Sequence, residues 1–141
     1  MEEQHHLRMV AASMIPANAE LGLPGANDSP IFADILEAAA PDGAGVRLAL
    51  RFLDETSGGN FAALDAGSQA AMAEKFRIDH PNQFILLVSI VVRCYYRDDR
   101  VMRWLSMEPR PPFPLGFELK QGDWSLLDPV RARPRLYREV P

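Results

Sequence analysis

The stretch Pro81-Asn-Gln-Phe-Ile-Leu-Leu-Val-Ser-Ile-Val-Val-Arg-Cys-Tyr-Tyr96 decides the fold. Its β-branched residues would also suit a strand, but a proline at the first helical position favours a helix, because no amide hydrogen is lost there. One apolar stripe recurs at helical spacing: Phe84, Leu87, Val88, Val91 and Tyr95. A second stripe follows at Ile85, Val92 and Tyr96. Since a helix that is apolar on nearly all sides is typical of a protein interior, we expect a buried central helix over about residues 81–97.

Further helices are predicted on both sides of this stretch. They are expected at 4–14, from Ser29 to about 40, from Asp42 to Thr56, from Asp65 to about Phe76, and from Asp98 or Asp99 to Leu105. Ser29, Asp42, Asp65 and one of the two later aspartates are the predicted N-caps, because their side chains accept hydrogen bonds from free backbone amides. Ser57-Gly58-Gly59 supplies a stop signal. The predicted fold class is all-α, a bundle of five to six helices around residues 81–97.

The composition changes at residue 108. Seven of the twelve prolines lie between 109 and 141, and proline-dense chain favours extended, polyproline-like conformations. The same segment is too rich in aromatic and aliphatic residues for a disordered linker. We therefore expect a helical domain over 1–107 and a proline-rich arm over 108–141, which packs either on its own domain or on a partner.

Aromatic and arginine side chains are enriched at protein interfaces. They are dense after the central stretch and again in the arm. On this composition the candidate partner-facing residues are Tyr95, Tyr96, Arg97, Phe113, Trp124, Arg131 and Tyr137.

Charge and cysteine content exclude several functions. Residues 1–92 carry 5 basic and 12 acidic side chains, and residues 93–141 carry 10 and 7. The later arginines alternate with acids and prolines and form no basic helix, so we predict no nucleic-acid partner.

The longest apolar run is too short to span a bilayer, and no membrane insertion is expected. Cys94 is the only cysteine, so an intramolecular disulfide and a multi-cysteine metal site are excluded.

No catalytic constellation is visible in the sequence. The adjacent residues His5 and His6 point about 100° apart on a helix and cannot share a metal ion on one face. Ser89 is expected to be buried with no base beside it, and Cys94 lies among apolar residues that raise the pKa of a thiol. We therefore predict no catalytic, cofactor-binding or metal-binding residue, and a chain that is not an enzyme by itself.

Several short motifs resemble the gluconate 2-dehydrogenase subunit 3 family. They are Met-Ile-Pro-Ala (14–17), Leu-Gly-Leu-Pro-Gly-Ala (21–26), Phe61-x-x-Leu64, Tyr-Tyr-Arg-Asp-Asp (95–99), Pro-Pro-Phe-Pro-Leu-Gly (111–116) and Gly-Asp-Trp-Ser-Leu-Leu-Asp-Pro-Val (122–130). The resemblance implies a small, mostly helical accessory subunit. Its partner would be a large glucose-methanol-choline type dehydrogenase that holds FAD and oxidises an alcohol or sugar hydroxyl.

The chain departs from that family at its N-terminus. Family members often carry a twin-arginine export signal, whereas Met-Glu-Glu-Gln-His-His lacks the basic-then-apolar order of a signal sequence. We expect a cytoplasmic protein, or a periplasmic one exported on a partner's signal. The alternative function is a self-contained interaction or regulatory domain that homodimerises through the arm, with no flavoprotein partner.

Overall fold

The computed structural model describes residues 2–59, 61–111, 113–118 and 121–134. These residues form helices and connecting loops, and no β-strand occurs among them. The chain divides into two units, Met1–Pro109 and Arg110–Pro141. We call them the helical unit and the C-terminal unit.

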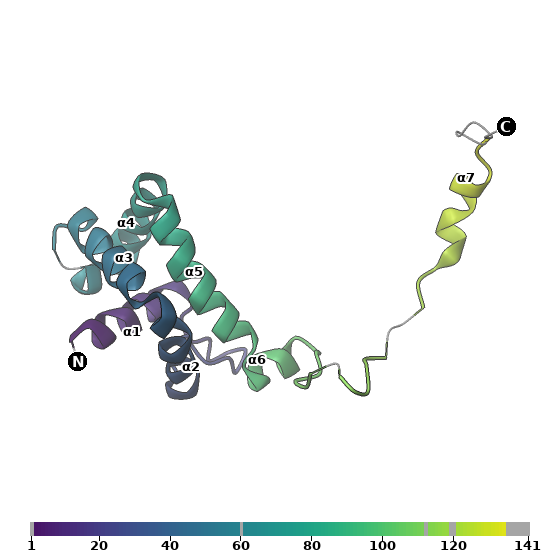
Figure 1. Cartoon of the computed structure of the whole chain (residues 1–141), viewed down its shortest axis with the longest axis horizontal. Helices are drawn as coiled ribbons and strands as arrows, with labels where there is room; N and C mark the ends of the chain where they lie inside the picture. Colours follow the sequence, from purple (N-terminus) through teal and green to yellow (C-terminus); the bar gives the residue numbers. More distant parts are fainter. Residues whose placement is uncertain (1, 60, 112, 119–120, 135–141) are drawn as a thin grey trace. The chain divides into compact units, whose positions relative to one another are not determined.

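The helical unit confirms the predicted all-α bundle (Figure 1). Its helices are α1 (Glu2–Met14), α2 (Ser29–Ala39), α3 (Gly43–Thr56), α4 (Ala66–Asp79), α5 (Pro81–Tyr96) and α6 (Asp99–Trp104), with 3-10 turns at Ala40–Asp42 and Phe61–Ala63. The longest of them, α5, contacts α2, α3, α4 and α6. The central position predicted for residues 81–97 is therefore confirmed.

Short polar residues start three of these helices as the sequence predicts. The Asp65 carboxylate accepts hydrogen bonds from the amides of Gly67 and Ser68, both at 3.0 Å. Asp98 accepts one from the amide of Arg100 at 2.9 Å, and Asp42 precedes α3 without a side-chain bond. The prediction for α2 is off by one residue, because its N-cap is Asp28 and Ser29 is already helical.

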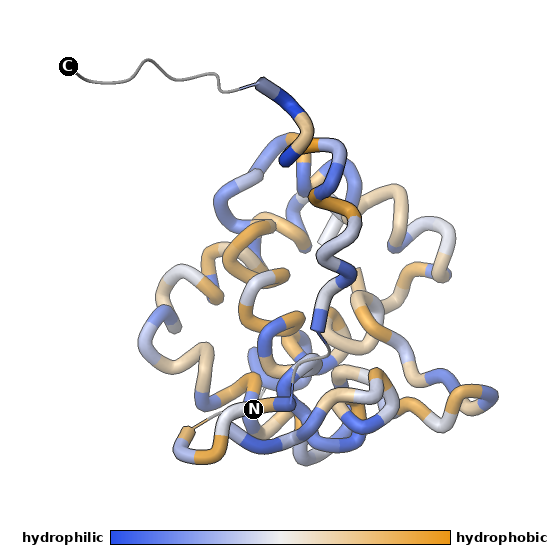
Figure 2. The backbone as a smooth tube through the Cα atoms, turned by 90° about the vertical axis from the view of Figure 1, so that its right-hand side faces the viewer, coloured by the Kyte–Doolittle hydropathy of each residue, from blue (hydrophilic) through white to orange (hydrophobic). Residues whose placement is uncertain are grey.

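The inner face of α5 is the centre of the core. Leu87, Ile90, Val91, Cys94 and Tyr95 are all buried there. They pack in one hydrophobic cluster with apolar residues of the other helices. Figure 2 shows hydrophobic and hydrophilic stretches alternating along the tube, as expected for helices with one apolar face each.

The second apolar stripe of α5 corrects the prediction of a helix buried on nearly all sides. Ile85 is 62% exposed, Val92 37% and Tyr96 52%. Ser89 is exposed as well, and its hydroxyl donates to the Leu86 carbonyl at 3.0 Å. Within the helical unit, the neighbouring helices cover one side of α5 and leave the other side exposed.

Two motifs that carry the family resemblance meet in the loop between α1 and α2. The Ala26 amide donates to the Ile15 carbonyl at 2.8 Å, and the amides of Asn18 and Leu23 bond each other's carbonyls. A Cβ at Gly25 would lie 2.8 Å from the Ala17 nitrogen. The loop thus brings 14–17 against 21–26 so closely that only glycine fits at position 25.

The C-terminal unit is less extended than its prolines predict. A 3-10 turn, Trp124–Leu127, leads into a short helix, α7 (Asp128–Arg131). Asp123 caps the turn by accepting from the Ser125 amide at 3.0 Å, and a proline lies in the first turn of α7. Proline is tolerated there because the first amides of a helix have no intrahelical partner.

The two faces of α5 should respond differently to truncation. We expect Leu87→Ala to lower the free energy of unfolding by about 2–5 kcal/mol, because it opens a cavity in the core. We expect Ile85→Ala to change it by less than about 0.5 kcal/mol, because the side chain is exposed. Urea unfolding of the purified variants measures both, and an equally large loss for Ile85→Ala would mean that something covers the outer face.

The α1–α2 loop should not tolerate a methyl group at position 25. We expect Gly25→Ala to destabilise the protein by about 1–3 kcal/mol, because the added Cβ overlaps the Ala17 backbone. Gly122→Ala is the control, since its Cβ would meet no described atom within 4 Å. Thermal unfolding of the two variants should show a loss for Gly25→Ala alone.

Candidate interaction surface

The exposed face of α5 is apolar where a surface helix is normally polar. Ile85, Ser89, Val92 and Tyr96 follow one another at spacings of four, three and four residues. At ~100° per residue they lie within about 60° of each other around the helix axis, at the centre of the exposed face. We call these four residues the α5 seam.

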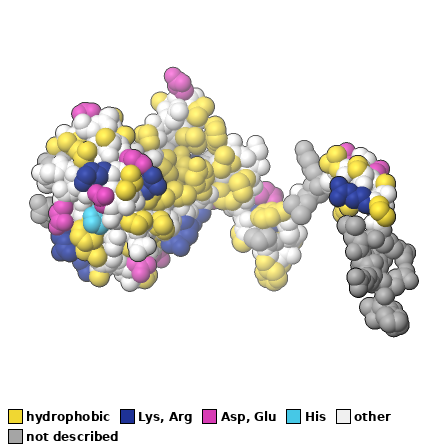
Figure 3. Space-filling model, turned by 90° about the horizontal axis from the view of Figure 1, so that it is seen from above, with side chains coloured by type: hydrophobic (Ala, Val, Ile, Leu, Met, Phe, Trp, Pro, Cys, Tyr) yellow, Lys and Arg dark blue, Asp and Glu magenta, His cyan; other side chains and the backbone are white. Residues whose placement is uncertain are grey.

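Hydrophobic side chains gather in a broad patch on the helical unit, next to a surface of mixed charge (Figure 3). The chain after α5 adds exposed Trp104, Leu105 and Met107. Exposed apolar patches on proteins indicate interaction sites.

An apolar groove borders the seam. A pocket of about 300 Å³ is lined by Met14 of α1, by Phe76 of α4 and by Phe84, Val88 and Val92 of α5, among others. Val92 therefore belongs both to the seam and to the wall of this pocket.

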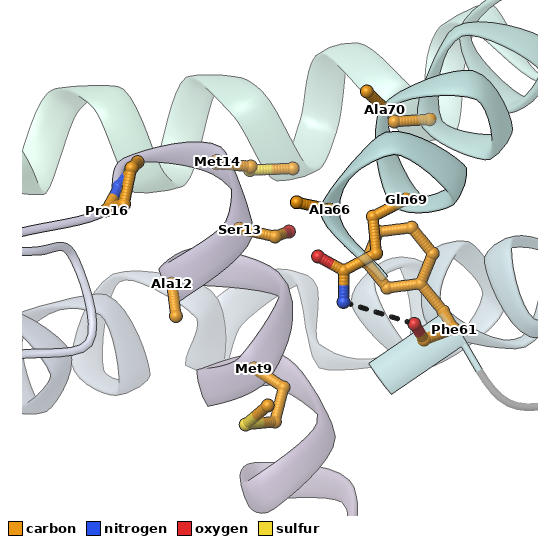
Figure 4. A pocket seen from close by; sticks show the side chains of 10 residues that line it. Met9, Ala12, Ser13, Met14, Pro16, Phe61, Ala66, Gln69 and Ala70 are labelled. Carbon is orange, nitrogen blue, oxygen red and sulfur yellow. Dashed lines mark hydrogen bonds between the residues drawn. The ribbon is translucent and has the colours of Figure 1, made fainter. Parts of the chain in front are cut away.

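A second pocket, of about 370 Å³, continues the groove between α1 and α4. Figure 4 shows Met9 and Ser13 of α1 on one side and Ala66 and Ala70 of α4 on the other. The two pockets share four lining residues, which are Ser13, Met14, Phe61 and Ala73. In the 370 Å³ pocket the Gln69 side-chain amide donates to the Phe61 carbonyl at 3.3 Å. Among the described residues, no charged side chain lines either pocket, so the groove favours uncharged groups.

Arg93 lies beside the seam and differs from the other arginines of the helical unit. Those arginines each make a hydrogen bond or ion pair within the described residues: Arg8, Arg47, Arg51, Arg77, Arg97, Arg100 and Arg103. Arg93 makes neither with any residue that the structure describes, although its charge helps to lower the pKa of Asp34. Arg93 is an exposed residue, so a carboxylate from outside the unit can reach its side chain.

Ion pairs attach the C-terminal end of α5 and the start of α6 to α2 and its N-cap. Arg97 bonds both carboxylate oxygens of Asp34, and this hydrogen bonding lowers the pKa of that carboxyl. Arg100 bonds Asp28 at 2.6 Å and Asp98 at 3.0 Å. The hydrogen bond from Arg100 likewise lowers the pKa of Asp98. These contacts hold the exposed face of α5 in place relative to α2.

Two ionisable side chains of α5 lie inside the core. Burial raises the pKa of the Cys94 thiol, and the neighbouring Asp34 carboxylate raises it further. Burial also raises the pKa of Tyr95. Both groups stay neutral at pH 7, and a neutral buried thiol is a poor nucleophile.

The residues nominated from composition fall in different places. Tyr96 is on the seam, but Tyr95 is only 5% exposed and belongs to the core. The Arg97 guanidinium already forms an ion pair with the Asp34 carboxylate of α2. In the C-terminal unit, Phe113 and Trp124 are exposed.

Two nominated residues remain. Arg131 pairs with Asp128 at 3.3 Å, and Tyr137 lies outside the described residues.

The nomination from composition missed Ile85, Val92 and Arg93. Ile85 and Val92 could have been found from the spacing of four, three and four residues between Ile85 and Tyr96, because this spacing indicates a narrow stripe of two residues per heptad.

Two of the three histidines, His6 and His80, make pairing or packing contacts within the described residues. His6 Nδ1 lies 3.3 Å from an Asp54 carboxylate oxygen, and the His80 ring stacks on Phe52 with centroids 4.2 Å apart. No three histidine, cysteine, aspartate or glutamate side chains gather as a metal site in the described part of the chain.

No described helix is long and apolar enough to cross a membrane. No protein-family model, curated protein or solved structure matches the chain.

The Asp34–Arg97 pair should make stability depend on acid pH. Because the pKa of Asp34 is lowered in the folded protein, its contribution is present above the unfolded pKa of about 4 and is lost as pH falls through the folded value. We expect Asp34→Asn to cost up to about 1 kcal/mol at pH 7. Urea unfolding at pH 7 and pH 3 measures this, and an equal cost at both values would contradict it.

Proposed function

We propose that this chain is a non-catalytic accessory subunit that binds and stabilises a larger protein through the outer face of α5. The observation that carries the proposal is the apolar seam at the most exposed part of the central helix. Ile85, Val92 and Tyr96 are already partly buried, so completing their burial on a partner would contribute only part of the about 1.5–3 kcal/mol that full burial of a large apolar side chain is worth. A helix that is already packed against α2, α3, α4 and α6 offers this face without reorganisation.

The resemblance to the gluconate 2-dehydrogenase subunit 3 family names the partner class. We propose a large glucose-methanol-choline type dehydrogenase that holds the FAD and oxidises an alcohol or sugar hydroxyl. Exposed apolar side chains of the C-terminal unit, such as Phe113, Leu115 and Trp124, would add contact area to the same complex. The small subunit would then supply binding surface and the large subunit all of the redox chemistry.

Co-expression tests the proposal. A tagged copy of the chain, expressed with the flavoprotein encoded beside it, is expected to elute as a yellow complex with the absorbance bands of a flavin. We expect Ile85→Asp to lower the recovered flavoprotein at least about tenfold, because a carboxylate would be buried in an apolar contact. Ile78→Asp is the matched control, since Ile78 on α4 is 63% exposed and Ile85 62%.

A colourless eluate from the wild-type chain would contradict the flavoprotein partner. If that chain also sediments as a dimer, and Ile85→Asp but not Ile78→Asp makes it monomeric, the homodimeric interaction domain replaces the proposal.

A further inference from the structure

We infer that the α5 seam binds an amphipathic helix of the partner protein. This helix would carry an apolar stripe of two residues per heptad and an acidic side chain opposite Arg93. The inference rests on the proposed function insofar as the partner is the flavoprotein, and it deepens that function by naming the chemistry of the contact.

The spacing of the seam points to a helix. Ile85, Ser89, Val92 and Tyr96 occupy the d, a, d and a positions of two consecutive heptads. Eleven residue steps at ~1.5 Å each make a seam of about 16 Å, which a facing helix would cover with roughly one and a half heptads. The described residues contain no strand whose edge an extended peptide could join, so strand addition is not open to this face.

The groove beside the seam gives the partner helix an anchor point. Val88 and Val92 form one wall of the 300 Å³ pocket, together with Phe84. An apolar side chain that leaves the facing helix on this side would enter the pocket between α1, α4 and α5. Anchors of this kind, buried at the centre of an interface, contribute most of the binding energy.

Arg93 favours a negatively charged side chain on the facing helix of the partner. It lies next to the seam, on the flank away from Val88, in the position at which coiled-coil helices exchange ion pairs. A partner carboxylate is expected there, because no described residue pairs with Arg93 while the other arginines of the helical unit are engaged. A second copy of α5 would not supply it, since Pro81–Tyr96 contains no aspartate or glutamate.

Two variants test the inference in the complex with the co-expressed flavoprotein. We expect Ile85→Asp and Arg93→Glu each to reduce the recovered flavoprotein, by at least about tenfold and about fivefold respectively. Ile78→Asp controls for the first change, and Arg51→Glu, which makes the same charge change on α3, controls for the second. A wild-type complex that survives both seam variants would overturn the inference and leave the proposed function standing.

Two designed peptides test it without the flavoprotein. Each is a helix of about 18 residues, long enough at ~1.5 Å per residue to span the seam. Both carry leucine at a and d, and they differ in having only glutamate or only lysine at e and g. Fluorescence anisotropy with the full chain is expected to show about five- to tenfold tighter binding of the glutamate peptide.

Peptide binding by variants of the chain shows which residues of the seam make the contact. We expect Arg93→Glu to reverse the preference for glutamate, and Ile85→Asp to abolish binding of both peptides. If the wild-type chain fails to co-purify with the flavoprotein but shows this pattern, the proposed function fails and the inference stands. Equal binding of the two peptides, or no binding of either, would overturn the inference.

Discussion

The burial of one face of α5 is the interaction on which the rest of the structure depends. Leu87, Val91 and Tyr95 leave water only when α2, α3 and α4 pack around them. At about 25 cal/mol for each Å² of apolar surface removed from water, this burial is the main favourable contribution to folding. The caps and loop bonds at Asp65, Asp98 and Ala26 place the surrounding helices so that they meet this face.

The core buries only one of the two apolar sides of α5. Its sequence is apolar on both sides, but its neighbours cover only one, so Ile85 and Tyr96 stay in water. Such a helix gains free energy from folding through one face and from association through the other. The ion pair between Arg97, at the end of α5, and Asp34 of α2 keeps the second face in a defined orientation, while Arg93 beside this face is exposed. Folding thus leaves an apolar face of α5 exposed.

The motifs that carry the family resemblance have a structural role in the α1–α2 loop. Residues 14–17 and 21–26 form a compact turn closed by the bond between Ala26 and Ile15, and the backbone at Ala17 leaves no room for a side chain at Gly25. The loop ends next to Asp28, which pairs with Arg100 at the start of α6. The motif residues therefore help to position α2 against α6 and against α5, which carries the seam.

The sequence by itself determined where the helices lie. Asp65, Asp98 and the Ser57-Gly58-Gly59 stop act on backbone groups within a few residues, so local rules suffice to predict them. Only the tertiary structure decided which stripe of α5 is buried, that Tyr95 is core while Tyr96 is exposed, and that Arg97 is paired while Arg93 is not. Periodicity shows which residues share a face of a helix, whereas burial and pairing depend on neighbours such as Asp34 that are distant in sequence.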